Sequence, residues 1–195
     1  MQIDHYLKPK TEIFFRGREL LDPADYPDFI YPFTSSSTST AVIADSPRAY
    51  HPETGFPSNP RMFVARLWLQ LGVFLDYFVG EHKPSLSKTL YAKGKRLDEE
   101  NLRQLIPINH HPLIPQLNVT SSWPPTFLCH GSLDTAVHLC ESEHMYGLLK
   151  KHGVQVALRV LDGKDHSFDY VPDAEKTFAA DFDEMAEFLD LHLKL

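Results

Sequence analysis

Two short segments carry side chains that could act together in catalysis. Asp134 ends the segment HGSLD, residues 130–134, and His166 lies in the segment GKDHSF, residues 163–168. A carboxylate that accepts a hydrogen bond from one imidazole nitrogen fixes the tautomer of the ring and leaves the other nitrogen as a general base. Asp134 and His166 are therefore candidates for the acid and the base of a catalytic triad.

Each segment follows an apolar run that is typical of a buried strand. The first run covers residues 126–129 and the second covers residues 154–161, and a helix is expected between them over residues 139–152. Two strands joined by a helix of this length must be parallel, and their carboxyl ends meet at one edge of the sheet. We therefore expect Asp134 and His166 on adjacent loops, within hydrogen-bond reach.

The chain closes with a predicted amphipathic helix over residues 173–193. Its apolar positions recur at four, three and four residues and form one stripe, which consists of Phe178, Phe182, Met185 and Leu189. Such a stripe indicates a surface helix packed on a core. The last seventy residues thus predict a βαβα unit.

The two motifs, their separation of about thirty residues and the closing helix together resemble the C-terminal part of α/β-hydrolases, with the esterase and lipase type, including fungal members, as the nearest likeness. In that family the Asp of HG-x-x-D is the acid and the His of G-x-x-H-x-F is the base. The resemblance therefore implies these roles for Asp134 and His166. It implies the fold class α/β, as a truncated α/β-hydrolase fold with the last two parallel strands, flanking helices and a helical cap segment.

The preceding part of the chain gives a weaker pattern. Residues 26–80 resemble the cap insertion of such enzymes, and within them residues 61–79 predict one helix that is apolar around most of its circumference. Residues 84–90 predict a turn-rich link, and residues 97–106 predict a further helix. We expect a loop-rich, helical, cap-like region over residues 1–122 and the βαβα unit over residues 123–195.

The nucleophile of such a triad is missing from the sequence. In α/β-hydrolases it lies in a G-x-S-x-G turn, whose glycines let the backbone bend sharply and expose the serine. The nine glycines include no pair four residues apart, and no serine has a glycine two positions away. An HGGG-type loop for the oxyanion is missing as well. We expect the chain to begin after the nucleophile.

Other reactive side chains have simpler interpretations. Cys129 could replace the serine, but a thiol at the end of a buried strand is more often an inert core residue. Cys140, His138 and His144 have a spacing unlike a zinc motif, so a solvated helix face is favoured. His110 and His111 are expected to be loop residues. We predict no metal and no cofactor.

The composition excludes several classes of protein. The 195 residues carry 26 acidic and 19 basic side chains, for a net charge of −7, which argues against nucleic acid as a partner. The two cysteines do not suggest a disulfide framework, and the N-terminus lacks the apolar run of a signal peptide. The apolar stretch of residues 61–79 contains Arg66, Gln70 and Asp76, which argue against a membrane span. A cytoplasmic protein is expected.

Two functional hypotheses remain open. The first is an esterase-like acyl hydrolase for an apolar ester, thioester or lactone, with a nucleophile from outside this chain. The alternative is a non-hydrolytic remnant that binds a small molecule, acts as an isomerase or cyclase, or serves as a partner subunit; a truncated gene product is a third interpretation. Because two parallel strands alone form a marginal sheet, we also expect a homo-oligomer or a complementing protein chain.

Overall fold

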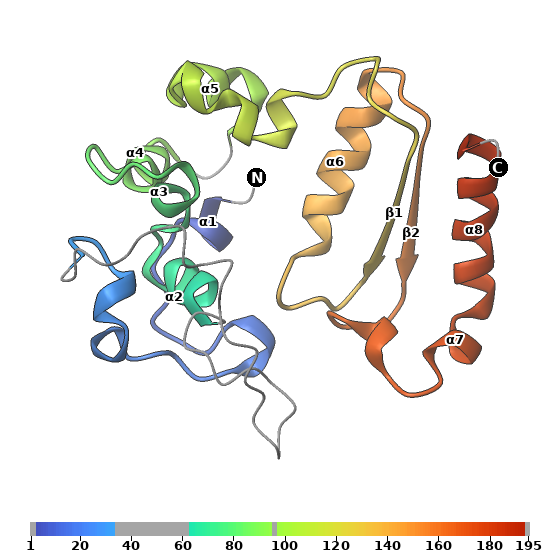
Figure 1. The fold of residues 1–195 in the computed structure, drawn as a ribbon, viewed down its shortest axis with the longest axis horizontal. Coiled ribbons are helices and arrows are strands. Elements are labelled where there is room, and N and C mark those ends of the chain that lie inside the picture. Colours follow the sequence, from blue (N-terminus) through green and yellow to red (C-terminus); the bar gives the residue numbers. More distant parts are fainter. Residues whose placement is uncertain (1–2, 34–62, 95–96, 194–195) are drawn as a thin grey trace. The chain divides into compact units, whose positions relative to one another are not determined.

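The computed structural model describes residues 3–33, 63–94 and 97–193 (Figure 1). Contacts between residues divide the chain into two compact units. The first unit consists mainly of Leu97–Leu195 and includes the short turn η1 (Phe15–Gly17), whereas the second consists of Ile3–Phe14 and Arg18–Arg96. The domain division expected at residue 122 stays a prediction.

The first unit is built around a sheet of two parallel strands, β1 (Thr126–Gly131) and β2 (Val156–Leu161). Helix α6 (Leu139–Lys151) connects them, and the register runs from Thr126 opposite Val156 to Gly131 opposite Leu161. The fold class α/β is thereby confirmed. The first strand extends two residues beyond the apolar run that predicted it, because His130 and Gly131 still pair with β2.

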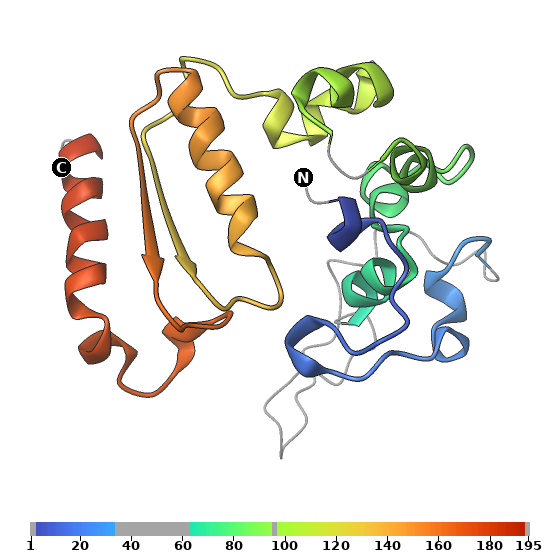
Figure 2. The same cartoon turned by 180° about the vertical axis from the view of Figure 1, so that it is seen from behind.

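Helices cover both faces of this sheet, as parallel strands require (Figures 1 and 2). On one face, Leu148 and Leu149 of α6 form a core cluster with Val119 and Val154. On the other face, Phe178 and Ala174 pack with Leu161 at the end of β2.

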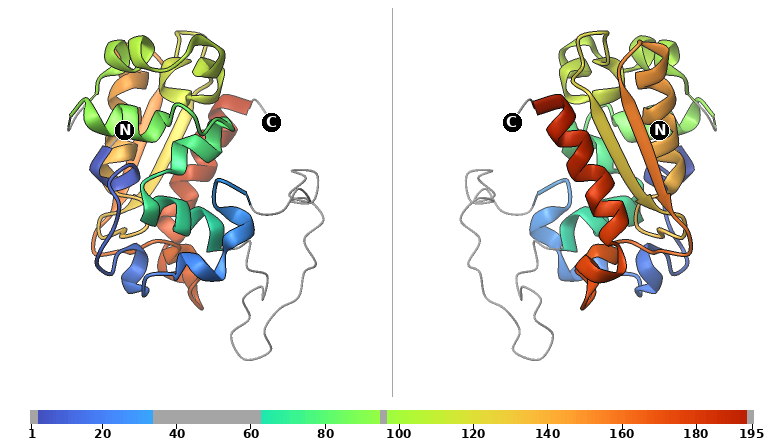
Figure 3. Two further views of the ribbon diagram at one scale, coloured as in Figure 1. Left: turned by 90° about the vertical axis from the view of Figure 1, so that its left-hand side faces the viewer. Right: turned by 90° about the vertical axis from the view of Figure 1, so that its right-hand side faces the viewer.

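Helix α8 (Ala179–Leu193) lies along the same face as the second cluster (Figure 3). The ring of Phe188 meets that of Phe127 edge to face, with centroids 5.4 Å apart, and Arg159 of β2 pairs with Asp181 at 2.6 Å. The single closing helix predicted over residues 173–193 is instead two helices, α7 (Ala174–Thr177) and α8. They are separated at Phe178, whose φ of −113° and ψ of 22° leave the helical region while its ring is buried.

Short helices precede the sheet in the first unit. Helix α5 (Glu99–Leu105) is capped by Asp98, whose carboxylate accepts from the backbone N–H of Asn101 at 2.8 Å. It is followed by the 3-10 helices η6 (Ile108–Leu113) and η7 (Pro115–Leu117). Glu99 pairs with Lys151 of α6 at 3.1 Å and contacts His144 at 3.6 Å. These contacts attach α5 to the helix that covers the sheet.

The described part of the second unit consists of short helices joined by loops. The helices are α1 (Ile3–Tyr6), η2 (Pro23–Asp25), η3 (Pro27–Phe29), α2 (Val64–Leu71), α3 (Phe74–Val79) and α4 (Leu86–Ala92). None of the helices in the described part of the chain is long and apolar enough to cross a membrane.

Two expectations about the second unit were wrong. The helix predicted over residues 61–79 is broken into α2 and α3 at Gly72, and its first two residues lie outside the described ranges. Gly72 has a φ of 68°, and a Cβ there would lie 2.5 Å from the carbonyl oxygen of Leu7, so the chain turns where only glycine fits. The link predicted over residues 84–90 instead contains most of α4. This helix is capped by Ser85, whose hydroxyl accepts from the N–H of Lys88 at 3.1 Å.

Buried polar side chains hold the second unit together. The carboxylate of Asp76 accepts from the backbone N–H of Ser87 at 2.8 Å and from the hydroxyl of Ser85 at 2.7 Å. The amide of Gln70 both donates to and accepts from the backbone of Leu21, at 2.7 and 2.8 Å. Of the polar residues that argued against a membrane span, Asp76 thus fastens α3 to the start of α4, and Gln70 fastens the loop at Leu21 to α2.

The packing of α6 on the sheet predicts a large loss of stability when Leu149 is shortened. Leu149 is 0% exposed, so Leu149→Ala should lower the free energy of unfolding of the first unit by about 2–5 kcal/mol through lost burial and a cavity. Urea unfolding followed by Trp123 fluorescence in a Trp68→Phe background measures this unit. Leu191→Ala, at a position 72% exposed, is the control and should change stability by less than about 0.5 kcal/mol. Equal effects of the two substitutions would contradict the packing.

Candidate active site

The candidate site lies on the two loops that follow β1 and β2. These loops are joined by backbone hydrogen bonds, since the N–H of Leu133 donates to the carbonyl of Lys164 at 2.9 Å and the N–H of Ser132 donates to that of Leu161 at 2.9 Å. The hydroxyl of Ser132 also accepts from the N–H of Gly163 at 2.8 Å. The loops are therefore fixed side by side at the carboxyl edge of the sheet.

Gly131 makes this close approach possible. A Cβ at this position would lie 2.8 Å from the carbonyl carbon of Lys164 and closer still to its oxygen. Any larger residue would push the second loop away, because a backbone carbonyl cannot move aside as a flexible side chain can. The HG-x-x-D motif thus requires glycine at this position, because the backbone of the other loop leaves no room for a side chain.

Asp134 and His166 meet where the loops run together. Oδ2 of Asp134 lies 2.9 Å from Nδ1 of His166, which is a hydrogen-bond distance and agrees with the predicted proximity. The side chain of Asp134 is 6% exposed and that of His166 is 40% exposed. The other oxygen of Asp134, Oδ1, accepts from the backbone N–H groups of Ala136 and Val137 at 2.8 Å each. The carboxylate is therefore held on both oxygens.

These contacts determine the protonation of the pair. Burial opposes the ionisation of Asp134, but the N–H groups of Val137, His166 and Ala136 outweigh it and lower the pKa of Asp134 below its ordinary value. An ionised carboxylate only accepts, so Nδ1 of a neutral His166 carries the proton and Nε2 keeps its lone pair. Nε2 makes no hydrogen bond to any residue within the described ranges. The half-exposed ring can thus accept a proton from a third group.

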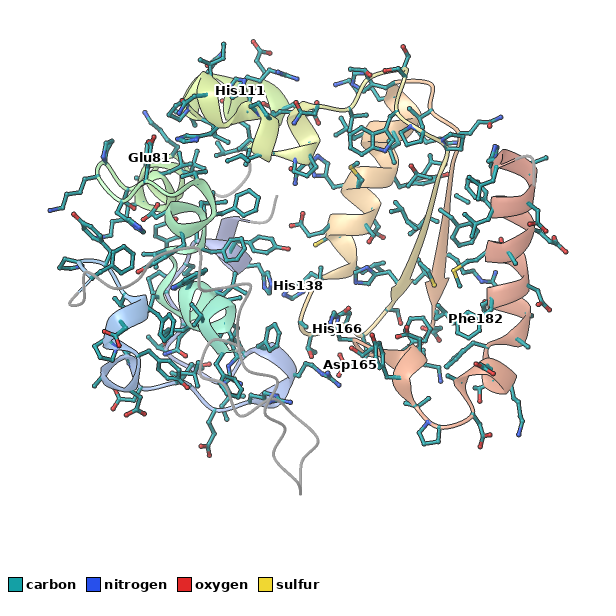
Figure 4. The ribbon with its side chains drawn as sticks, in the orientation of Figure 1. Glu81, His111, His138, Asp165, His166 and Phe182 are labelled. Carbon is teal, nitrogen blue, oxygen red and sulfur yellow. The ribbon has the colours of Figure 1, made fainter. Side chains whose placement is uncertain are left out.

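Asp165, which the sequence analysis missed, connects the two loops beside the pair (Figure 4). Its Oδ1 accepts from the backbone N–H of His166 at 2.7 Å, and from the N–H and hydroxyl of Thr135 at 3.1 and 3.2 Å. The N–H of His166, followed by that of Thr135, lowers the pKa of Asp165. Asp165 therefore fixes the backbone of His166 to the residue that follows Asp134. Its position directly before His166 in the motif was the signal available.

His130 is a second imidazole against Asp134, and the sequence analysis gave it no role. Its Nε2 lies 2.8 Å from the carbonyl oxygen of Val137 and 3.3 Å from Oδ2 of Asp134. Its Nδ1 lies 2.8 Å from the hydroxyl of Ser142 on α6. The histidine of HG-x-x-D thus contacts the acid directly.

The remaining reactive side chains lie outside this arrangement. Burial, followed by the charges of Asp181 and Asp169, raises the pKa of the Cys129 thiol, which opposes formation of a nucleophilic thiolate. His138 precedes the first turn of α6, and His144 contacts Glu99 instead of a metal-like set of ligands. His110 is buried and His111 meets the carbonyl of Ile106 at 2.9 Å. The described residues contain no group of three or more side chains that could hold a metal ion.

A carboxylate and an imidazole that pair on the loops after two parallel strands, with helices on both faces of the sheet, are the arrangement expected of the C-terminal part of an α/β-hydrolase fold. Comparison with known protein families supports the same fold class. The family model described as the prolyl oligopeptidase family matches residues 85–195, and the chain belongs to this family. The resemblance to α/β-hydrolases inferred from the two motifs is thereby confirmed.

The curated relatives are fungal enzymes of much greater length. A non-reducing polyketide synthase, mapC′ of Penicillium brevicompactum, is 31% identical over 130 residues, which are 60% of this chain and 6% of the relative. The non-reducing polyketide synthase adrD of Penicillium rubens is 36% identical over 158 residues, 79% of this chain and 6% of the relative. The non-reducing polyketide synthase ausA of Aspergillus calidoustus is 27% identical over 192 residues, 85% of this chain and 8% of the relative. No solved structure matches the chain.

The lowered pKa of Asp134 predicts how the stability of this site depends on pH. A carboxyl group whose pKa is lower in the folded than in the unfolded state stabilises the fold above its unfolded pKa of about 3.9, and this contribution disappears as the pH falls through the folded value. Asp134→Asn should therefore lower the free energy of unfolding by about 1.5–3 kcal/mol at pH 7. The difference from the wild type should shrink below about pH 4, where the wild-type carboxyl also becomes neutral.

Urea unfolding between about pH 3 and 7 measures this dependence. Asp190→Asn, at an exposed position of α8, is the matched control and should behave as the wild type throughout. A difference between wild type and Asp134→Asn that grows as the pH falls would contradict the assignment of Asp134 as a stabilised carboxylate.

Proposed function

We propose that this chain supplies the acid and the base of an acyl-transfer site that acts on an apolar ester, thioester or lactone. The observation that carries the proposal is the 2.9 Å contact between Oδ2 of Asp134 and Nδ1 of His166, which leaves Nε2 without a partner among the described residues. Asp134 orients the ring and His166 is the general base. Their membership in matching motifs of an α/β-hydrolase family supports the same roles.

The nucleophile in this proposal is a hydroxyl from residues outside the 195 of this sequence, since the sequence contains no G-x-S-x-G turn. Nε2 of His166 takes the proton of the hydroxyl while its oxygen attacks the acyl carbon. The imidazolium then returns that proton to the leaving alcohol or thiol, and an acyl–enzyme remains. Water repeats the two proton transfers and releases the acid. Asp134 stays ionised and stabilises the imidazolium in both stages.

The relatives support a particular class of acyl group. The polyketide synthases cited above are 27–36% identical to this chain, although the chain spans only 6–8% of their length. We therefore propose a polyketide-like acyl chain, carried as a thioester or closed as a lactone, as the substrate. A cytoplasmic location remains part of this proposal.

A non-hydrolytic role is the second candidate. It is favoured by the missing G-x-S-x-G turn and by the raised pKa of Cys129, which leaves no replacement nucleophile on β1. In this case His166 would serve as an acid and base for an isomerisation or cyclisation, or the chain would bind a ligand or a partner. A serine-directed phosphonate probe tests whether the chain itself contains a nucleophile, since labelling of the isolated chain would exclude the non-hydrolytic role and would also contradict a nucleophile outside this sequence; we expect no labelling.

We also propose that the chain associates with a second copy or with a complementing chain. The sheet of the described residues has two strands, and a two-stranded parallel sheet has marginal stability by itself. Sedimentation of the purified chain at micromolar concentration should show species larger than a monomer. A monomer that melts in one sharp, cooperative transition would contradict the association.

The acyl-transfer proposal predicts that His166 will catalyse acyl transfer when a nucleophile is added to the isolated chain. Without one, the isolated chain should hydrolyse the hexanoyl thioester of N-acetylcysteamine no faster than buffer, and His166→Ala should leave this rate unchanged. With a second thiol in excess, the wild type should accelerate transfer of the hexanoyl group to it, because Nε2 of His166 can remove the thiol proton. His166→Ala should lose this acceleration, by about 100-fold if general-base catalysis is fully expressed.

Product analysis by mass spectrometry measures the exchanged thioester. His192→Ala, which changes a histidine on α8 beside Phe188, is the control and should retain the wild-type rate. Equal transfer rates for wild type and His166→Ala would contradict the proposed function.

A further inference from the structure

We propose that His130 is a positioning residue that holds Asp134 in the orientation needed by His166. This inference rests on the proposed function, in which Asp134 and His166 act as acid and base. His130 does not touch the reacting atoms in this account. It acts through the turn that carries Asp134.

His130 belongs to the sheet and reaches two other elements. It is the second-last residue of β1, opposite Val160 of β2, and its side chain is 9% exposed. Nδ1 faces the hydroxyl of Ser142 on α6 at 2.8 Å, and Nε2 faces the carbonyl oxygen of Val137 at 2.8 Å. A single imidazole therefore connects the strand, the turn after it and the covering helix.

The partners fix the proton on this ring. A carbonyl oxygen can only accept, so Nε2 of His130 carries a hydrogen and donates it to Val137. In the neutral ring, Nδ1 then accepts from the hydroxyl of Ser142. In that ring both nitrogens have a hydrogen-bond partner, so no buried donor or acceptor is left unpaired.

The bond to Val137 controls the carboxylate of Asp134. Val137 is held at both ends of its backbone, since its N–H donates to Oδ1 of Asp134 at 2.8 Å while its carbonyl accepts from His130. The same Nε2 of His130 lies 3.3 Å from Oδ2, the oxygen that accepts from His166. The ring of His130 thus limits both the position of the turn and the rotation of the carboxylate.

A purely structural histidine would affect stability alone, so the test reads the Asp134–His166 pair directly. The hydrogen on Nδ1 of His166, held against a carboxylate, should give a downfield proton resonance in the NMR spectrum of the full chain that disappears in Asp134→Asn. His130→Gln retains a side-chain N–H donor that can reach Val137, whereas His130→Leu has none. Ser142→Ala keeps the imidazole and removes only its partner on α6.

We expect the downfield resonance to persist in His130→Gln, to be broadened or lost in His130→Leu, and to weaken in Ser142→Ala. Spectra are compared at a temperature where circular dichroism shows each variant to be folded. If His130→Leu does not fold, Ser142→Ala and His130→Gln decide the test. The proposal would be overturned if the resonance kept its full strength in Ser142→Ala and, where it folds, in His130→Leu. It would also be overturned if the resonance were lost in His130→Gln.

This readout is independent of acyl transfer. Failure of the thiol-exchange assay with an intact downfield resonance would contradict the proposed function alone. If acyl transfer depends on His166 but the downfield resonance is unchanged by substitutions of His130, the positioning role alone would be overturned.

Discussion

The hydrogen bond between Oδ2 of Asp134 and Nδ1 of His166 joins residues 32 positions apart, and it exists only because two loops approach each other closely. The parallel register of β1 and β2 ends with Gly131 opposite Leu161, so the chain leaves both strands at the same level. The missing side chain of Gly131 then admits the backbone of Lys164. A shift of either strand by one residue would reverse the faces of its side chains and separate the pair.

Polar contacts around Asp134 and His166 hold the two side chains in place after the sheet has brought their loops together. The backbone N–H groups of Ala136 and Val137 occupy one oxygen of Asp134, and the pKa of its carboxyl falls although burial acts against this. Asp165 links the backbone of His166 to Thr135 from the opposite loop. The acid is enclosed by these groups, while the base keeps one nitrogen turned away from them and remains half exposed. This asymmetry is suited to a base that must meet a group from elsewhere.

Much of this arrangement could be predicted from sequence patterns. The apolar runs, the helix between them and the two motifs predicted the parallel pair and the approach of Asp134 to His166, because strand order and loop direction follow from connectivity. His130 and Asp165 could not be assigned in this way, since their roles depend on distances between loops. The prediction of one helix over residues 61–79 failed at Gly72, where the apolar pattern continues although the backbone leaves the helical conformation. The catalytic roles of Asp134 and His166 stay predictions.

The central claim is that Asp134 fixes His166 with its proton on Nδ1 and a bare Nε2. The ¹⁵N chemical shifts of both ring nitrogens of His166 in the full chain, recorded above the pH at which the ring is protonated, measure this directly. The account predicts a protonated Nδ1 and an unprotonated Nε2 in the wild type, and a loss of this preference in Asp134→Asn. A wild-type ring with its proton on Nε2, or one that exchanges equally between both nitrogens, would contradict the account.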